Sequence, residues 1–294
     1  MPRSSGRPRR RGALGSMILS APLVLLVLGL VVFPLGRLLA DSFRPGSGIL
    51  GGGGAPGAWT LDNYREIWRD REYRRALWHS ITMSLGVGAS ATLLCLAPAW
   101  LLVRRTFRGK RLVRALLTLP MSFSGIIIGF LAIIMVGRLG VVPQLSQRIF
   151  GHAWLSGLSY SVWGLVVAYL YFEIPRATLT LEAALRKFDF QLEAAARTLG
   201  AGPWYRLGHV VLPLMTPALL STFAVTFSVS LGSFGVALIV SKRYSLLPLE
   251  IFQLYTGLLN AELAAAMAVV LIVIAIAVHV ASRRLLSREE SRIG

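Results

Sequence analysis

Four residues at helical spacing form the group with the greatest capacity for chemistry in this chain. Tyr169, Phe172, Glu173 and Arg176 fall at i, i+3, i+4 and i+7 of the segment YLYFEIPRATL, so a helix would present them on one face. An ionised carboxylate inside an apolar segment is costly unless it is paired or wetted. Two interpretations stay open. Glu173 pairs with Arg176, or it lines a polar cavity and meets a cationic group while the aromatic rings stack on that group.

A second candidate surface combines small and hydroxyl-bearing residues in the segment FSVSLGSFGVAL. Close packing between helices is the favoured interpretation. The alternative is a substrate path shared with the Glu173 segment, for which the candidates are Phe227, Ser230, Ser233 and Phe234. Gly125 and Gly129, in SGIIIGF, also fit the small-xxx-small pattern, which predicts close helix packing and says nothing about substrate.

The sequence predicts no catalytic residues, no metal site and no cofactor bound by this chain. Gly109-Lys110 is followed by Arg111, and Arg104 stands where a phosphate-binding loop needs its first glycine, so the chain is not expected to hydrolyse ATP. Cys95 is the only cysteine, and the four histidines are scattered over different segments. A membrane-embedded enzyme would need a convergent catalytic set, and this alternative of a different class has none in its favour.

These candidates lie in a chain whose composition is that of a membrane protein. Of its 294 residues 55% are hydrophobic and 15% charged, which leaves no large soluble domain. About 20 apolar residues cross a bilayer core. Six segments meet that length, which predicts an all-α polytopic fold: Met17–Leu39, Leu77–Val103, Val113–Val136, Ser159–Leu181, Thr216–Val240 and Leu263–Ala281.

The basic residues predict the orientation. The net charge of +18 fits the excess of Lys and Arg on the cytoplasmic side of membrane proteins, and we expect no nucleic-acid partner. Nineteen Lys and Arg fall on one side of six spans and ten on the other, which places both termini in the cytoplasm. The predicted domains are a basic tail (1–16), a six-helix membrane domain (17–281) and a cytoplasmic tail (282–294). The first span is expected to be an uncleaved anchor.

The outer loop, about 40–76, contains two predicted features. The glycine cluster from Gly46 to Gly57 follows a membrane segment rather than a strand, so a flexible linker is favoured over a phosphate cradle. Leu61, Tyr64, Ile67 and Trp68 recur at helical spacing and predict a short interfacial helix.

The predicted cytoplasmic loop, about 182–213, contains an apolar stripe, which predicts that a partner protein binds there. In LEAAARTLGAGPWYRLGHVVLPLMTPAL the stripe consists of Leu192, Leu199, Trp204, Leu207 and Val210. Asp189 can cap the first helix, Glu193 lies in its first turn, and Gly200 can take the left-handed conformation that ends it. The loop is therefore predicted to form a helix–turn–helix knob.

This loop resembles the cytoplasmic loop of permease subunits in binding-protein-dependent ABC importers. The family signature is E-A-A-x-x-x-G, followed about a dozen residues later by an apolar residue and L-P. Ala195, Ala196, Gly200, Leu212 and Pro213 match it. Ala194 stands at the position of the family's Glu, and the carboxylate comes one residue earlier, at Glu193. The segments WTLDNYREIW, LLTLPMSFSG and SLGSFGVALIV extend the resemblance.

The resemblance implies a type I ABC importer permease fold in a prokaryotic cytoplasmic membrane. The knob would dock in a groove of a soluble ATPase dimer, which would bind ATP and Mg, through Leu192, Glu193, Ala195, Ala196, Leu199, Gly200, Ala201 and Leu207. The further partners implied are an extracytoplasmic solute-binding protein and a second permease subunit, with a heterodimer favoured over a homodimer. Resemblance to polyamine systems, with Glu173 as a partner for an amine, favours a polyamine or other small amine as substrate. Iron(III), thiamine and an aminoalkylphosphonate are the alternatives.

Overall fold

The fold is all-α, as predicted, in the part of the chain that the structure describes. The computed structural model describes residues 22, 25–46, 59–137, 139–151, 161–188, 190–241 and 244–293, with side chains as far as residue 285. The basic tail 1–16, the start of the first span, most of the glycine cluster and Asp189 lie outside the described residues. The helices are η1 (Leu28–Val32), α2 (Phe33–Ser42), α3 (Asp62–Arg69), α4 (Arg71–Arg104), α5 (Lys110–Thr118), η2 (Pro120–Ser122), α6 (Gly125–Val136), α7 (Val141–Phe150), α8 (Val162–Leu185), α9 (Phe190–Thr198), α10 (Pro203–Arg206), η4 (Leu207–Val211), α11 (Leu212–Leu231), α12 (Phe234–Val240), α13 (Leu247–Thr256) and α14 (Ala261–Ile293).

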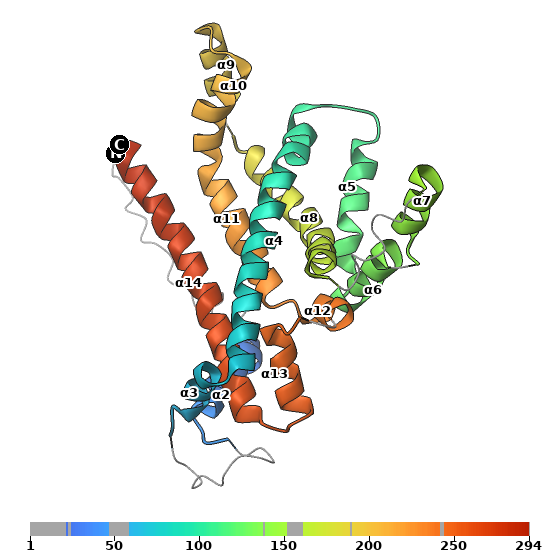
Figure 1. The fold of residues 1–294 in the computed structure, drawn as a ribbon. Coiled ribbons are helices and arrows are strands. Elements are labelled where there is room, and N and C mark those ends of the chain that lie inside the picture. Colours follow the sequence, from blue (N-terminus) through green and yellow to red (C-terminus); the bar gives the residue numbers. More distant parts are fainter. Residues whose placement is uncertain are drawn as a thin grey trace, which may run out of the picture.

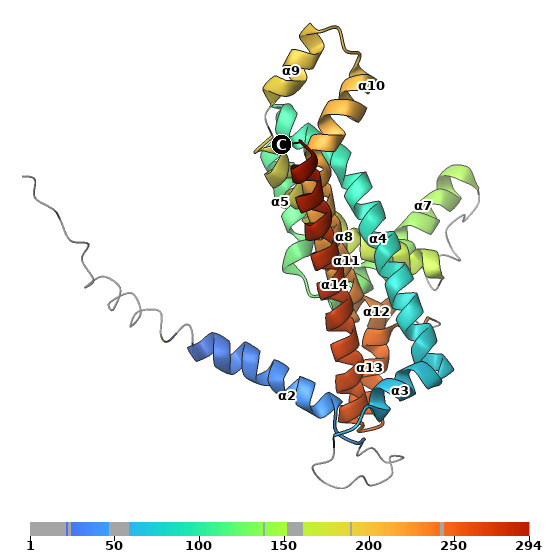
Figure 2. The same cartoon turned by 90° about the vertical axis from the view of Figure 1, so that its left-hand side faces the viewer.

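Long helices run along the axis of the molecule, with short helices at both ends. Figures 1 and 2 show α4, α11 and α14 packed along this axis, with α9 and α10 at one end and α3 and α13 at the other. We call these the hairpin end and the outer end. Helix α8 packs against α4 and α11, whereas α2 contacts α14 and diverges from the bundle (Figure 2). The C-terminal part of α14 lies toward the hairpin end.

Five helical segments among the described residues are long and apolar enough to cross a membrane. They are Leu25–Ser42, Arg71–Arg104, Gly125–Phe150, Pro203–Leu231 and Ala261–Leu285. The predicted fourth span corresponds to α8, which is not among them and which carries Glu173, Arg176 and Glu182. The count of six spans and the cytoplasmic placement of both termini stay predictions.

Two predicted spans are interrupted helices. The span predicted at Val113–Val136 is divided into α5, η2 and α6, because Pro120 cannot donate a backbone hydrogen bond and Ser124 starts a new helix as its N-cap. Within the span predicted at Thr216–Val240, helix α11 ends at Leu231. Helix α12 begins at Phe234, after Gly232 and Ser233. Irregular backbone at membrane depth is tolerated where protein or a water-filled cavity surrounds it.

Glycines let α6 and α12 approach closely. A Cβ on Gly125 would lie 3.4 Å from the Gly235 Cα, and a Cβ on Gly129 would lie 2.8 Å from the Ile239 Cβ. A Cβ on Gly235 would lie 2.7 Å from the Ile126 backbone nitrogen. The close packing predicted from Gly125 and Gly129 is therefore confirmed.

Two wide π-helical turns each precede a proline. Segment η1 ends at Val32, two residues before Pro34, and η4 ends at Val211, two residues before Pro213. A proline inside a helix has no N–H and its ring crowds the carbonyl four residues earlier. A wider turn before it relieves that crowding and keeps the helix continuous.

A short helix is present where the sequence predicted one, as α3, and its side chains connect the elements of the outer end. Its placement at a membrane interface stays a prediction. Ile67 is buried in a cluster with residues of α4, α13 and α14, while Trp68 is exposed. The Asn63 amide donates to the Ser42 carbonyl oxygen at 3.0 Å and to the Arg44 carbonyl oxygen at 2.7 Å.

Candidate functional site

The predicted knob is a helical hairpin that projects from the bundle. Helices α9 and α10 are joined by a short turn and extend beyond α4 and α8 (Figure 2). Gly200 has φ +82°, which is the left-handed conformation predicted for it. The Gly200 N–H donates to the Arg197 carbonyl and the Ala201 N–H to the Ala196 carbonyl, both at 3.1 Å, so two carbonyls of the last turn of α9 are satisfied.

The tip of this hairpin exposes large apolar side chains. Leu199 is 87% exposed and Trp204 is 82% exposed, and Leu192 is half exposed on α9. Ala195 is exposed, and Ala196 and Ala201 are half-buried. Since single exposed apolar residues are ordinary but a contiguous apolar tip marks an interaction site, this arrangement suits a docking surface.

Leu207 does not belong to the exposed tip, contrary to the exposure predicted for it. It is half-buried against the cluster of α4, α8 and α11 that contains Cys95, Leu181 and Met215. The reason is the continuation of α10 through η4 into α11, which directs Leu207 toward the bundle rather than toward the tip.

Glu193 is buried beneath the hairpin and ties it to a long membrane helix. Its carboxylate is paired with the Arg104 guanidinium at the end of α4, and the Arg206 Nη1 lies 3.7 Å from its Oε1. The Arg104 guanidinium also stacks over Trp100 at 4.8 Å and over Phe190 at 5.1 Å. Glu193 is thus an internal brace between α9, α4 and α10 and is not part of the exposed tip.

The candidate substrate residues on α8 form an internal pair. The Glu173 side chain is fully buried, and both of its oxygens accept from the Arg176 Nη1 at 3.0 Å. The Arg176 guanidinium stacks over Phe172 at 4.9 Å. Of the two interpretations left open by the sequence, the pairing with Arg176 is the one that the structure contains.

The remaining candidate substrate residues lie where α8 contacts the break between α11 and α12. The Tyr169 hydroxyl donates to the Ser233 carbonyl at 2.8 Å, and Tyr169 and Ser230 line one narrow pocket with Ser80 and Ser84 of α4. A water molecule finds essentially no room in that pocket, since its accessible volume is about 0 Å³. Phe227 is buried, and Phe234 packs against Phe252 with ring centroids 4.8 Å apart. The region around Tyr169 and Ser230 is therefore tightly packed in this structure.

Two ion-pair partners in this region were missed by the sequence prediction. Arg104 lies 89 residues before Glu193, so no local spacing could have linked the two. Glu182 pairs with Arg186 one helical turn later and with Arg114 of α5. The i,i+4 spacing of Glu182 and Arg186 is a signal that could have identified half of that group.

Comparison with known proteins supports the resemblance to importer permeases that the cytoplasmic loop indicated. A family model described as "Binding-protein-dependent transport system inner membrane component" matches residues 85–290. The chain is 34% identical to the molybdenum transport system permease protein ModB of Escherichia coli (strain K12), over 55% of this chain and 70% of that protein. It is 30% identical to the spermidine/putrescine transport system permease protein PotC of Haemophilus influenzae, over 75% of this chain and 79% of that protein.

A solved structure shares the fold at low sequence identity. It is that of a bacterial alginate ABC transporter in complex with an alginate pentasaccharide-bound periplasmic protein, with a TM-score of 0.73, 16% identity and coverage of 95% of each chain. The family model covers well over half of the chain and includes the whole hairpin. The chain therefore belongs to the family of inner-membrane permease components of binding-protein-dependent ABC importers, and it is a multi-pass membrane protein.

Proposed function

We propose that this chain forms half of a solute pathway and is driven by a separate ATPase that docks on the α9–α10 hairpin. The observation that supports this most directly is the exposed apolar tip with Leu199 and Trp204, held on a rigid turn at the hairpin end. A helix that inserts an apolar face into a groove is a common mode of recognition. The partner would be a soluble ATPase dimer that binds ATP and Mg. A second permease subunit, preferably a different one, would supply the other half of the pathway, and an extracytoplasmic binding protein would deliver the solute.

The contacts of the hairpin support a mechanical role. Helix α10 continues through η4 into α11, so a push on the tip acts along a helical run from Pro203 to Leu231. The Glu193–Arg104 pair connects the same hairpin to α4. A rigid-body movement of docked ATPase subunits would therefore shift α4 and α11 together and open the packed region around Tyr169.

Replacement of Leu199 with Asp tests the docking proposal. A charge at the centre of an apolar contact is desolvated on docking, so we expect the variant to lose ATPase association and uptake while it still inserts into the membrane. Leu61→Asp at the outer end is the matched control, because Leu61 is also exposed. Co-purification of the ATPase measures the effect. Normal association and uptake in Leu199→Asp would contradict the proposal.

For the substrate, we propose a small oxyanion, with a polyamine as the second candidate. The Glu173 carboxylate is already neutralised by Arg176, so an amine would have to displace a buried guanidinium. Two buried hydroxyls on α11, those of Thr222 and Ser230, have no hydrogen-bond partner among the described residues. Hydroxyls donate readily to oxyanions. The relative ModB is named for molybdenum transport, whereas PotC, named for spermidine and putrescine, keeps the polyamine prediction as the second candidate.

Uptake by cells that express the complete importer distinguishes these two substrates. We expect accumulation of labelled molybdate and little accumulation of labelled putrescine. Glu173→Gln is informative, because it removes the negative charge of the carboxylate while it keeps the shape of the side chain, and it leaves the Arg176 guanidinium without its counter-ion. Putrescine uptake that is present in the wild type and lost in Glu173→Gln would overturn the oxyanion proposal and restore Glu173 as an amine ligand.

A further inference from the structure

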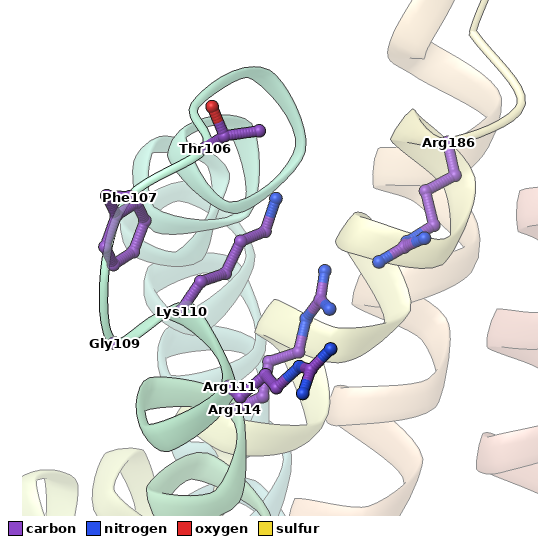
Figure 3. Close-up of a pocket in the computed structure, with 7 residues that line it drawn as sticks. All are labelled: Thr106, Phe107, Gly109, Lys110, Arg111, Arg114 and Arg186. Carbon is purple, nitrogen blue, oxygen red and sulfur yellow. The ribbon is translucent and has the colours of Figure 1, made fainter.

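A basic pocket lies at the hairpin end, apart from the hairpin and from the candidate path. It is lined by Thr106, Phe107, Gly109, Lys110, Arg111, Arg114 and Arg186 and has a volume of about 560 Å³. Figure 3 shows Lys110, Arg111 and Arg114 coming from α5 and Arg186 from the end of α8, with their charged groups around a shared space.

The cations of this pocket exceed the acids that could neutralise them. Glu182 pairs with both Arg114 and Arg186. Among the described residues, no carboxylate lies within salt-bridge distance of Lys110 or Arg111, and the Lys110 ammonium donates only to the Arg105 carbonyl at 3.1 Å. Cations held close together repel one another, so an anion in the space between them would be stabilised. An excess of basic residues at a cytoplasmic loop serves insertion, but insertion does not require that they converge on a cavity.

An apolar stripe runs along the side of α5 that faces away from the pocket. Leu112, Leu116 and Leu119 follow at one-turn spacing, and they are 63%, 56% and 52% exposed. Helix α5 thus offers cations at its first turn and an uncovered apolar stripe along its length. An uncovered apolar stripe of this kind suits contact with acyl chains, so it places the first turn of α5, and with it the pocket, at the level of the lipid headgroups.

We propose that this pocket binds the headgroup phosphate of an anionic phospholipid from the cytoplasmic leaflet, at the depth that the apolar stripe of α5 indicates. The Lys110 ammonium and the Arg111 guanidinium provide the free donors, and Arg114 and Arg186 form the rear wall with Glu182. The site would anchor the start of α5 to the headgroup layer. It is independent of the solute and of the docking of the ATPase.

The test measures lipid binding to the purified full chain in detergent by native mass spectrometry. The probes are phosphatidylglycerol and phosphatidylcholine with identical acyl chains. We expect about tenfold or greater preference for phosphatidylglycerol in the wild type, and its loss in the double variant Lys110→Gln, Arg111→Gln, since each basic residue near an anionic surface strengthens binding severalfold. The matched control is Arg197→Gln, Arg283→Gln, which removes two exposed charges at the same end and should keep the preference.

Further results separate the sources of the anion. Equal binding of the two lipids by the wild type would overturn the proposal without recourse to any variant. Displacement of phosphatidylglycerol by millimolar sulfate or inorganic phosphate at constant ionic strength would assign the pocket to a free oxyanion instead. Loss of ATPase co-purification in the double variant, with lipid preference unchanged, would assign it to the protein partner. A photoactivatable phosphatidylglycerol should label the peptide that contains residues 107–119 in the wild type and the control, and not in the double variant.

Discussion

At the scale of single residues, the position of Glu193 changes the meaning of the motif. The family signature places a Glu at the position of Ala194, which is exposed here, whereas Glu193 points inward to Arg104 and Arg206. A shift of one residue turns a side chain by about 100° around a helix. The carboxylate of this chain therefore braces the hairpin from below instead of lying on its docking face.

Removal of the Arg104 charge tests this brace. In Arg104→Gln the buried Glu193 keeps only the more distant Arg206, so we expect a loss of about 1–3 kcal/mol in the free energy of unfolding. We also expect ATP hydrolysis by the assembled importer to continue while uptake falls, because α9 is no longer tied to α4. Arg105→Gln removes the exposed neighbouring charge and should change neither quantity. Equal effects of the two substitutions would show that Arg104 acts only through net charge.

A buried carboxylate at the outer end makes stability depend on pH. Burial raises the pKa of Glu250, and the nearby Glu72 and Asp70 raise it further, against the opposing hydrogen bond from Ser245. Because the pKa is higher in the folded chain than in the unfolded chain, the associated stability is full below the usual Glu pKa and is lost as the pH rises through the folded pKa. The Tm of the wild type should fall over that range, and the Tm of Glu250→Gln should fall less. Parallel Tm curves would contradict this assignment.

At the scale of elements, the sequence predicted the helices well and their interruptions poorly. Apolar length located α4 and α14, and helical spacing located α3 and the hairpin, because these signals are local. Hydropathy stays high across Pro120 and Gly232, so it could not show that two spans are divided. The contacts of the site were still less accessible, since Glu193 meets Arg104 and Tyr169 meets Ser233 across 89 and 64 residues.

The turn of the hairpin is the element whose geometry depends most on one residue. No heavy atom lies within 4 Å of a Cβ built on Gly200, so a substitution there meets only the conformational cost of φ +82°. Asn tolerates that region and a β-branched residue does not. We expect Gly200→Asn to retain uptake and Gly200→Val to lose about 1–2 kcal/mol of local stability together with ATPase association. Hydrogen exchange of the α9 amides measures the local effect, and equal protection in both variants would refute it.

The crossing of α6 and α12 gives a second element-scale prediction. Gly235→Ala would place a methyl group 2.7 Å from the Ile126 backbone nitrogen, whereas Gly86→Ala on α4 meets nothing within 4 Å. Overpacking of this kind costs about 1–3 kcal/mol, and a Gly to Ala change in an open helix position is neutral or stabilising. Thermal unfolding in detergent should separate the two variants, and a lower Tm for Gly86→Ala than for Gly235→Ala would contradict the close crossing.

At the scale of the whole molecule, the two ends of this inner-membrane permease carry different surface features. The hairpin end combines the exposed apolar tip, where we propose that the ATPase docks, with the basic pocket, and the outer end holds α3 and α13. Single-cysteine labelling tests the orientation, because the native Cys95 is buried and can be replaced with Ser. A cysteine at Thr198 should react with an impermeant reagent only in inverted vesicles, and a cysteine at Leu61 only in intact spheroplasts. The opposite pattern would reverse the orientation predicted from charge.

The wide turn η4 between α10 and α11 affects the angle at which the hairpin can meet the proposed ATPase. The hydrogen bond of a π-helical turn spans five residues instead of the four of an α-helix, so the extra residue sets the rotation of the hairpin tip relative to α11. Deletion of one residue between Leu207 and Val211 would restore a regular helix and rotate Trp204 by about 100° about the axis of α11. Single-residue insertions and deletions at this one turn are therefore a means by which docking angles can diverge between importers, while the pathway below keeps its packing.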